Sequence, residues 1–147
     1  MKVLPHYKED EGAKCSWSVS LLANVNFLSP EDAHLIFAYM ESCAVIDGWL
    51  SNIRDPISGR FDIPAKTWSD GEYVWDSSHS HYVSRYAARL PEEFIEHVKR
   101  QVATGFDART LDSAKLRADF ERLLERLAAG DESFYASYRN SDGLSHF

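Results

Sequence analysis

The residues best suited to chemistry lie close together near the middle of the chain, in residues 76–81. Two histidines, His79 and His81, stand beside Asp76, and together they offer the nitrogen and oxygen ligands that a divalent metal takes. Such a metal could activate a water molecule for hydrolysis. The surrounding pattern predicts a helix, however, and residues two apart on a helix do not share a face. A metal-dependent hydrolase built on this cluster is therefore an alternative function, and it needs an irregular backbone.

Other signs of catalysis are absent from the sequence. There is no nucleophile motif of the G-x-S-x-G type and no glycine-rich phosphate loop. The two cysteines, Cys15 and Cys43, are too few for a disulfide framework or a zinc quartet. Both lie among apolar residues, which favours unreactive thiols. We therefore expect a protein that is not an enzyme and that has no cofactor and no metal ligands.

The charge of the chain is unevenly distributed. The 147 residues include 23 acidic and 16 basic ones, a net charge of −7, and 44% are hydrophobic. Nine acidic and three basic residues lie in residues 31–76, a net charge of −6. An acidic chain is a poor ligand for nucleic acid, because phosphate contact needs a basic face. The segment could attract a basic protein, although a solvated acidic surface explains the same charges.

Three of the four tryptophans lie in or beside this acidic segment, namely Trp49, Trp68 and Trp75. Aromatic side chains provide contact area at protein interfaces, and surrounding carboxylates guide the approach of a basic partner. We expect Trp49 and Trp75 to lie in the core. Trp68 stands at a predicted turn beside Asp70 and is the best candidate for an exposed aromatic contact.

The elements that position these residues follow from periodicity and capping. Apolar residues alternate over 15–28, which predicts a strand, with a helix as the alternative. Ser29 and Pro30 have the residue types that begin a helix, and Gly48 is the expected end. A β-hairpin is expected over 61–75.

Three more helices are predicted after the hairpin. They begin at Asp76 or Ser77, at Pro91 and at Asp112, and the last two end at Gly105 and Gly130. The fold class is therefore α+β, mainly helical, with four to five helices and a small antiparallel β-hairpin or sheet. We expect a single domain over 1–147, with 1–14 and 140–147 loosely ordered. The chain has no apolar signal core after Met1 and no apolar run of membrane-spanning length, so we expect a cytoplasmic protein without a membrane partner.

A series of motifs runs through the middle of the chain. Residues 53–61 read I-R-D-P-I-S-G-R-F, residues 69–75 read S-D-G-E-Y-V-W, residues 82–86 read Y-V-S-R-Y, and residues 90–95 read L-P-E-E-F-I. The series resembles small bacterial immunity proteins of contact-dependent growth inhibition and related polymorphic-toxin systems. The resemblance covers about residues 29–100 and consists of structural residues, without a catalytic signature.

The resemblance implies a protein that binds and neutralises the C-terminal toxin domain of a cognate effector in the bacterial cytoplasm. Such toxins are often nucleases with basic substrate sites. On this interpretation, acidic residues pair with lysine or arginine, a tryptophan packs as an anchor, and two histidines add hydrogen bonds. The predicted partner-binding residues are Asp55, Asp62, Trp68, Asp70, Glu72, Asp76, His79 and His81. A non-catalytic interaction or scaffold module remains a third hypothesis, and the sequence leaves the oligomeric state open.

Overall fold

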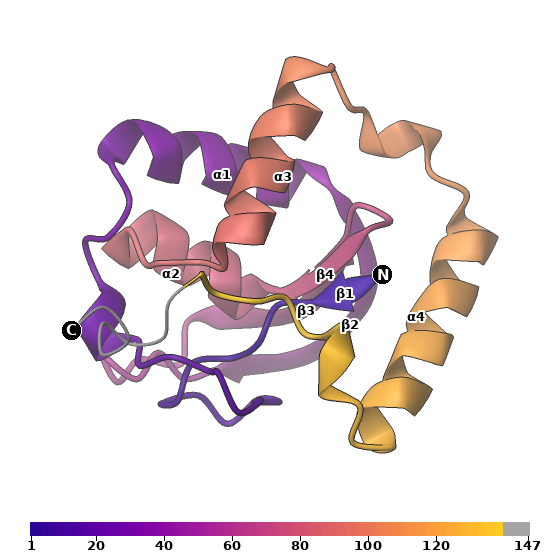
Figure 1. The fold of residues 1–147 in the computed structure, drawn as a ribbon. Coiled ribbons are helices and arrows are strands. Elements are labelled where there is room, and N and C mark those ends of the chain that lie inside the picture. Colours follow the sequence, from indigo (N-terminus) through magenta and orange to yellow (C-terminus); the bar gives the residue numbers. More distant parts are fainter. Residues whose placement is uncertain (140–147) are drawn as a thin grey trace.

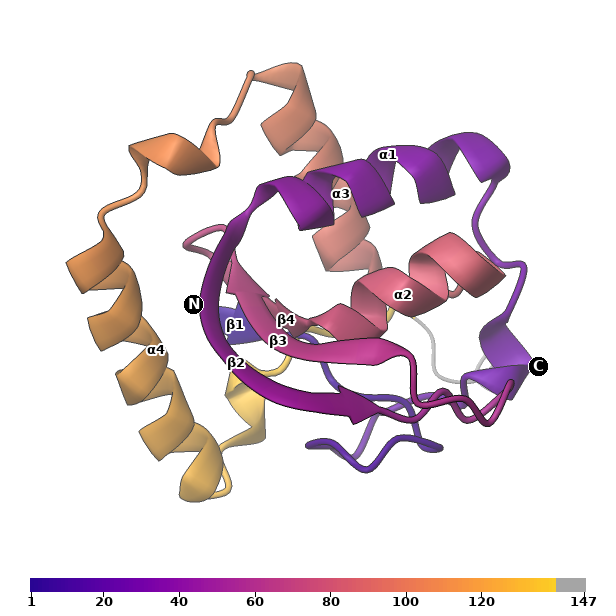
Figure 2. The same cartoon turned by 180° about the vertical axis from the view of Figure 1, so that it is seen from behind.

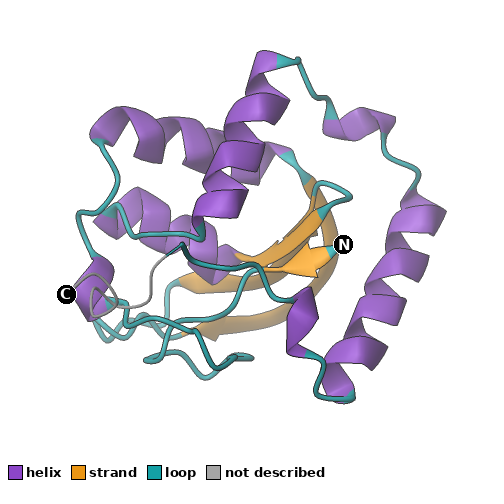
Figure 3. Ribbon diagram, in the orientation of Figure 1, coloured by secondary structure: helices purple, strands orange, loops and turns teal. Residues whose placement is uncertain are grey.

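The computed structural model describes residues 1–139 and shows an α+β fold of four α-helices and a four-stranded sheet (Figures 1 and 3). The strands are β1 (Lys2–Val3), β2 (Ala44–Ile53), β3 (Ile63–Ser69) and β4 (Tyr73–Asp76). The α-helices are α1 (Pro30–Ser42), α2 (Ser77–Tyr86), α3 (Glu92–Ala103) and α4 (Ser113–Ala128). Short 3-10 helices are η1 (Leu22–Asn24), η2 (Ala108–Thr110) and η3 (Glu132–Phe134). Within residues 1–139, no helix is long and apolar enough to cross a membrane.

The sheet is mixed, where a purely antiparallel one was expected. Its order is β1-β4-β3-β2, and β3 pairs antiparallel with both neighbours. The predicted β-hairpin is present as β3 and β4, but β1 joins β4 in parallel. The N-terminal segment is also less loose than expected, because the side chains of Leu4 and Tyr7 are fully buried.

Helix α1 begins as predicted and ends earlier than predicted. The Ser29 hydroxyl accepts a hydrogen bond from the backbone N–H of Asp32 at 3.1 Å, which caps the helix. The helix ends at Ser42 instead of reaching Gly48, because the following residues form β2. Val45 and Ile46 are β-branched residues that suit a strand, and Val45 pairs with Trp68 of β3. Ile46 lies at an interruption of the pairing, and its carbonyl accepts a hydrogen bond from Arg117 instead.

The alternating segment 15–28 forms neither a strand nor an α-helix, apart from the three residues of η1. Side chains take over the backbone groups that a β-ladder would need. The Glu9 carboxylate accepts hydrogen bonds from the N–H groups of Leu21 and Leu22, both between 2.7 and 3.0 Å. The Asn24 amide donates to the carbonyl of Ser20 at 2.7 Å. Such local hydrogen bonds compete with regular structure, and here they overrode the alternation.

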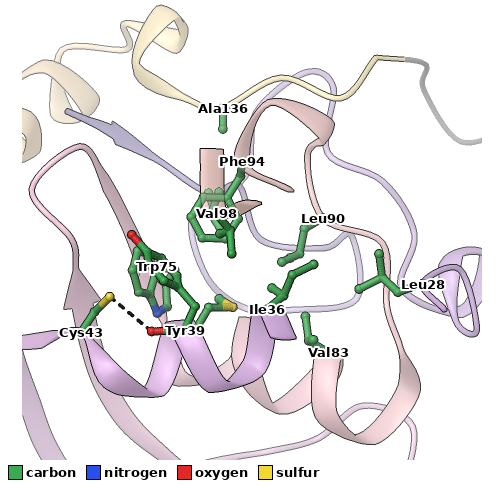
Figure 4. Close-up of a cluster of buried hydrophobic side chains, with 12 residues drawn as sticks. Leu28, Ile36, Tyr39, Cys43, Trp75, Val83, Leu90, Phe94, Val98 and Ala136 are labelled. Atoms are coloured by element: carbon green, nitrogen blue, oxygen red, sulfur yellow. Dashed lines mark hydrogen bonds between the residues drawn. The ribbon is translucent and has the colours of Figure 1, made fainter. Parts of the chain in front are cut away.

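The helices cover both faces of the sheet. Val74 and Trp75 are adjacent in β4 and therefore point to opposite faces. Trp75 packs with residues of α1, α2 and α3 in one core cluster (Figure 4), whereas Val74 packs with Leu116 and Phe120 of α4 in another. Figures 1 and 2 show α4 standing apart from the other three helices accordingly.

The later helix starts and ends agree with the sequence. Asp76 occupies the N-cap of α2, and the Asp112 carboxylate accepts from the N–H groups of Ala114 and Lys115 at the start of α4. Gly105 and Gly130 follow α3 and α4 with φ angles of +72° and +83°. These are left-handed conformations that favour glycine, which explains why each helix ends there.

Candidate functional site

The structure buries three of the eight predicted partner-binding residues. Asp55, Asp70 and His79 have relative exposures of 0%, 2% and 1%. A side chain this buried cannot touch a partner while the fold is intact. Burial therefore argues against the prediction that these three residues bind a partner, and the contacts they make lie inside the molecule.

Asp70 holds the turn between β3 and β4. One carboxylate oxygen accepts hydrogen bonds from the backbone N–H groups of Glu72 and Tyr73, at 2.9 and 2.8 Å. The other accepts from the Tyr39 hydroxyl at 2.6 Å and from His97 Nε2 at 2.7 Å. Burial opposes the charge, but these hydrogen bonds outweigh it and lower the pKa of Asp70. The neighbouring Glu72, which was also predicted to bind a partner, is exposed.

Asp55 plays the same part in the loop between β2 and β3. One oxygen accepts from the N–H groups of Ile57 and Ser58, which forms the turn that the sequence predicts. The other accepts from His81 Nε2 at 2.9 Å and from the Tyr86 hydroxyl at 2.6 Å, both on α2. Against the cost of burial, these donors lower the pKa of Asp55 to about 2.

The predicted metal cluster of Asp76, His79 and His81 does not assemble. His79 Nδ1 accepts from the backbone N–H of Asp76 at 3.0 Å, and its Nε2 donates to the carbonyl of Pro5 at 3.1 Å. Both nitrogens are therefore occupied by the cap of α2 and the N-terminal segment. Burial lowers the pKa of His79 to about 4, so the ring is neutral. His81 turns to Asp55 instead.

A different trio among the described residues has metal-ligating atoms close together. Atoms of Asp55, Asp62 and His81 all lie within 4.8 Å of one another. Each of these groups already has a partner in the protein. Asp55 accepts from His81, and Arg85 pairs with Asp62 at 3.4 Å. These contacts account for the trio without a metal ion.

Two of the three tryptophans in or beside the acidic segment are not located as the sequence predicted. Trp75 lies in the core as predicted. Trp68 is only half-buried and packs against the same core cluster, with its indole N–H donating to the Ser77 hydroxyl at 2.9 Å. Trp49, expected in the core, is 62% exposed. Trp49 is therefore a better anchor for a partner than Trp68.

The cysteines agree with the expectation of unreactive thiols. Cys43 is buried beside α1 and its thiol donates to the carbonyl of Tyr39 at 3.3 Å (Figure 4). Burial raises the pKa of Cys43 to about 12 and also raises the pKa of Cys15. Neither group forms a reactive thiolate at neutral pH.

His6 is the centre of a polar site that the sequence did not reveal. Its Nε2 lies 2.6 Å from Asp76 Oδ2, and its Nδ1 lies 3.4 Å from Asp10 Oδ2. Burial disfavours the charged ring, but the hydrogen bonds and charges of the two carboxylates prevail and raise the pKa of His6 to about 9. The ring is an imidazolium at neutral pH. His6 and Asp76 are 70 residues apart, so no local motif joins them.

Beside this imidazolium lies a hollow of about 340 Å³, which we call the His6 cleft. Its lining includes His6, Asp10, Glu11, Arg54, Asp76 and Ser78. Ser78 is only 1% exposed, and its hydroxyl has no hydrogen-bond partner among residues 1–139. The cleft therefore joins the start of α2 to the chain just after β2 and to the N-terminal segment.

The second surface feature is the outer edge of the sheet. In the sheet formed by residues 1–139, strand β2 has a neighbouring strand on one side only. Its pairing with β3 is interrupted twice, between Val45 and Asp47 and between Gly48 and Asn52. Three apolar side chains on this strand are exposed, and we call them the β2 edge patch: Val45, Trp49 and Leu50. Leu50 is fully exposed. This patch was missed because the sequence pattern extended α1 through Val45 to Gly48.

Five of the predicted partner-binding residues remain at least partly accessible: Asp62, Trp68, Glu72, Asp76 and His81. Asp76 lines the His6 cleft, and Glu72 lies at the opposite end of β4, so the structure does not gather these residues into one site. Comparison of the chain with protein-family models, curated proteins and solved structures gives no match. The geometry of the two surface features therefore carries the functional argument.

Proposed function

We propose that this protein is a cytoplasmic immunity protein that binds the toxic domain of a cognate bacterial effector and neutralises it by protein–protein contact, without catalysis. The observation that carries the proposal is the β2 edge patch. The motif series over residues 29–100 supports the same class of protein. The bound toxin domain is basic, as a nuclease with an exposed substrate site is.

The composition of the patch favours a protein partner. Trp49 and Leu50 lie next to each other at an interruption of the ladder, where the chain is released from regular pairing. Tryptophan is enriched among the residues that dominate binding energy, because it buries a large area at small entropic cost. Two large exposed apolar side chains at consecutive positions of an edge strand are typical of a surface that binds another protein, because in an isolated monomer they stay in contact with water.

The charge of the chain favours a basic partner. The net charge of −7 creates a field that attracts a positively charged domain and raises the rate of encounter. Four acidic residues of the 31–76 segment are exposed, namely Glu31, Glu41, Asp62 and Glu72. Two others, Asp55 and Asp70, are buried and stabilise turns within the fold. In this proposal the exposed acidic residues attract the partner, and the β2 edge patch provides the contact.

The test is a binding and protection experiment with the toxin domain encoded beside the gene. The intact chain is expected to co-purify with that domain and to protect cells that produce it. The double variant Trp49→Ser, Leu50→Ser should weaken the complex by about 30-fold or more, since truncation of a central anchor costs about 2 kcal/mol or more.

Val102→Ser provides the matched control. Val102 is also an exposed apolar residue, although less so than Trp49 and Leu50, and it lies near the end of α3 instead of on β2. The control variant should bind as tightly as the unchanged chain. Absence of a complex with the unchanged chain, together with absence of protection, would overturn the proposed function. Equal losses in both variants would remove the patch from the interface.

A further inference from the structure

We propose that the His6 cleft is a pocket for a basic side chain, a guanidinium or an alkylammonium group, presented by the protein partner. This inference rests on the proposed function for the identity of the partner, but the recognition chemistry belongs to the cleft itself. It adds a second, polar contact to the apolar one at the β2 edge patch.

The first argument is the unpartnered hydroxyl of Ser78. Ser78 lies in the first turn of α2, is 1% exposed and lines the cleft, yet its hydroxyl makes no hydrogen bond within the described part of the chain. A buried hydroxyl without a partner costs free energy, and buried polar groups are paired in the great majority of cases. A bound group that reaches the Ser78 hydroxyl supplies the missing partner.

The second argument is the sign of the charge. Four carboxylates line the cleft, those of Glu9, Asp10, Glu11 and Asp76, against the two cations His6 and Arg54. With His6 charged, as its two carboxylate neighbours require, the lining carries a net charge of −2. A cation entering this partly enclosed space is attracted, and an anion is repelled.

The third argument is that the groups around His6 are arranged for binding and not for proton transfer. Both ring nitrogens of His6 point at carboxylates, so neither is free to take a proton from the Ser78 hydroxyl. Glu9 is held by backbone N–H groups of Leu21 and Leu22. Glu11 is exposed, which leaves its carboxylate available to pair with an incoming cation.

The fourth argument is position. Ile53, the last residue of β2, and Arg54 both line the cleft, and Leu50 of the β2 edge patch is three residues before Ile53. At about 3.3 Å per residue, patch and cleft are roughly 10 Å apart along the strand. A typical protein interface covers about 800 Å² on each partner, which includes both features. One partner surface can therefore place an apolar contact on the patch and a basic side chain in the cleft.

The experiment titrates the full chain, labelled with nitrogen-15, with ethylguanidinium chloride as the probe. Saturable shifts are expected for the backbone N–H signals of Gly12, Arg54 and Ser78, which all line the cleft. Ethylurea, a neutral molecule of similar shape, should produce no saturable shift at the same residues. Sodium acetate tests the opposite charge and should also produce none.

Two variants identify the groups responsible. Ser78→Ala should weaken ethylguanidinium binding by about tenfold, because it removes a hydrogen bond to a charged group. Glu11→Gln should weaken it by about two- to fivefold, as expected for an exposed charge. The matched control Glu121→Gln, at an exposed site on α4, should leave binding unchanged.

The outcomes separate this inference from the proposed function. A toxin complex that forms normally, with no saturable ethylguanidinium binding, overturns the cleft proposal alone. So does a saturable response to acetate in place of ethylguanidinium, or an equal response to ethylurea. Saturable ethylguanidinium binding that Ser78→Ala weakens, in a chain that forms no toxin complex, supports the cleft and overturns the proposed function.

Discussion

At the scale of single residues, the acidic side chains of this protein fall into two groups, buried aspartates that hold the fold together and exposed acidic residues. Three buried aspartates share one pattern: the carboxylate of each accepts hydrogen bonds from at least one backbone N–H group, from a histidine ring and from a tyrosine hydroxyl. The three groups are Asp10 with His6 and Tyr82, Asp55 with His81 and Tyr86, and Asp70 with His97 and Tyr39. A buried carboxylate persists only when it is satisfied in this way. These aspartates therefore hold loops to helices, and in the function that we propose only the exposed acidic residues can attract a partner.

His6 makes the stability of the protein depend on pH. Its folded pKa of about 9 lies above the ordinary value of 6.5, so the folded state binds the proton more tightly than the unfolded state. The stabilisation is fully present below pH 6.5 and is lost as the pH rises to about 9. The rise in the pKa of His6 corresponds to a stabilisation of about 3 kcal/mol. This figure is an upper limit for His6, because Asp10 and Asp76 take part in the same interaction.

Urea unfolding at a series of pH values between 6 and 9.5 tests this. The free energy of unfolding should fall across the interval in the unchanged chain, and the fall should be smaller in His6→Gln. His34→Gln, at an exposed position on α1, should retain the full slope. A slope that is the same in the His6 and His34 variants would contradict the assignment.

At the scale of elements, local signals predicted the helix starts well. Ser29, Asp76 and Asp112 all occupy the N-cap positions that their residue types favour. The turn residues around Asp55 and Asp70 were also predicted, because short polar side chains bind the backbone nearby. These features depend on neighbours within four residues, which a single sequence displays directly.

Features that depend on distant residues could not be predicted. Strand β2 exists because β3 pairs with it, and its residues continue the apolar spacing of α1, so the pattern extended the helix to Gly48. The alternation over 15–28 is overridden by Glu9. The candidate site was the hardest feature to predict from the sequence. His6 contacts Asp76 across 70 residues, and Trp49 lies at an interruption of the ladder between β2 and β3.

The cap of α4 allows a direct test at this scale. Asp112→Ala should lower the free energy of unfolding by about 1 kcal/mol, because two backbone N–H groups lose their acceptor. Glu125→Ala, an exposed change on the same helix, should alter it by no more than about 0.5 kcal/mol. Thermal or urea unfolding measures both, and equal effects would show that the loss of charge, and not of the cap, is responsible.

At the scale of the whole molecule, the sheet has two faces that helices cover and an edge, at β2, that is exposed. Helices cover both faces, with α4 against Val74 on one and α1, α2 and α3 around Trp75 on the other. Among residues 1–139, the side of β2 that faces away from β3 has no neighbouring strand. The β2 edge patch lies on this strand, and the His6 cleft lies just beyond its end, so the surface that we propose for partner binding follows an edge of the sheet and not a face.

The net charge of −7 predicts how association with a basic toxin domain responds to salt. The screening length falls from about 30 Å at 0.01 M salt to about 8 Å at 0.15 M. The association rate constant should therefore fall by about tenfold over this range. Stopped-flow mixing measures it, and the Trp49→Ser, Leu50→Ser variant should show its loss mainly in the dissociation rate. An association rate independent of salt would contradict a role for the acidic field.

The two interruptions in the β2–β3 ladder have a consequence for the storage and solubility of the protein. An exposed strand edge with large apolar side chains is a template on which further copies can stack into fibrils. Such stacking needs a straight, continuous row of backbone groups, and the irregular stretches at Val45–Asp47 and Gly48–Asn52 divide the row into short pieces. The chain can thus leave the side chains of Trp49 and Leu50 exposed to water and still resist amyloid growth.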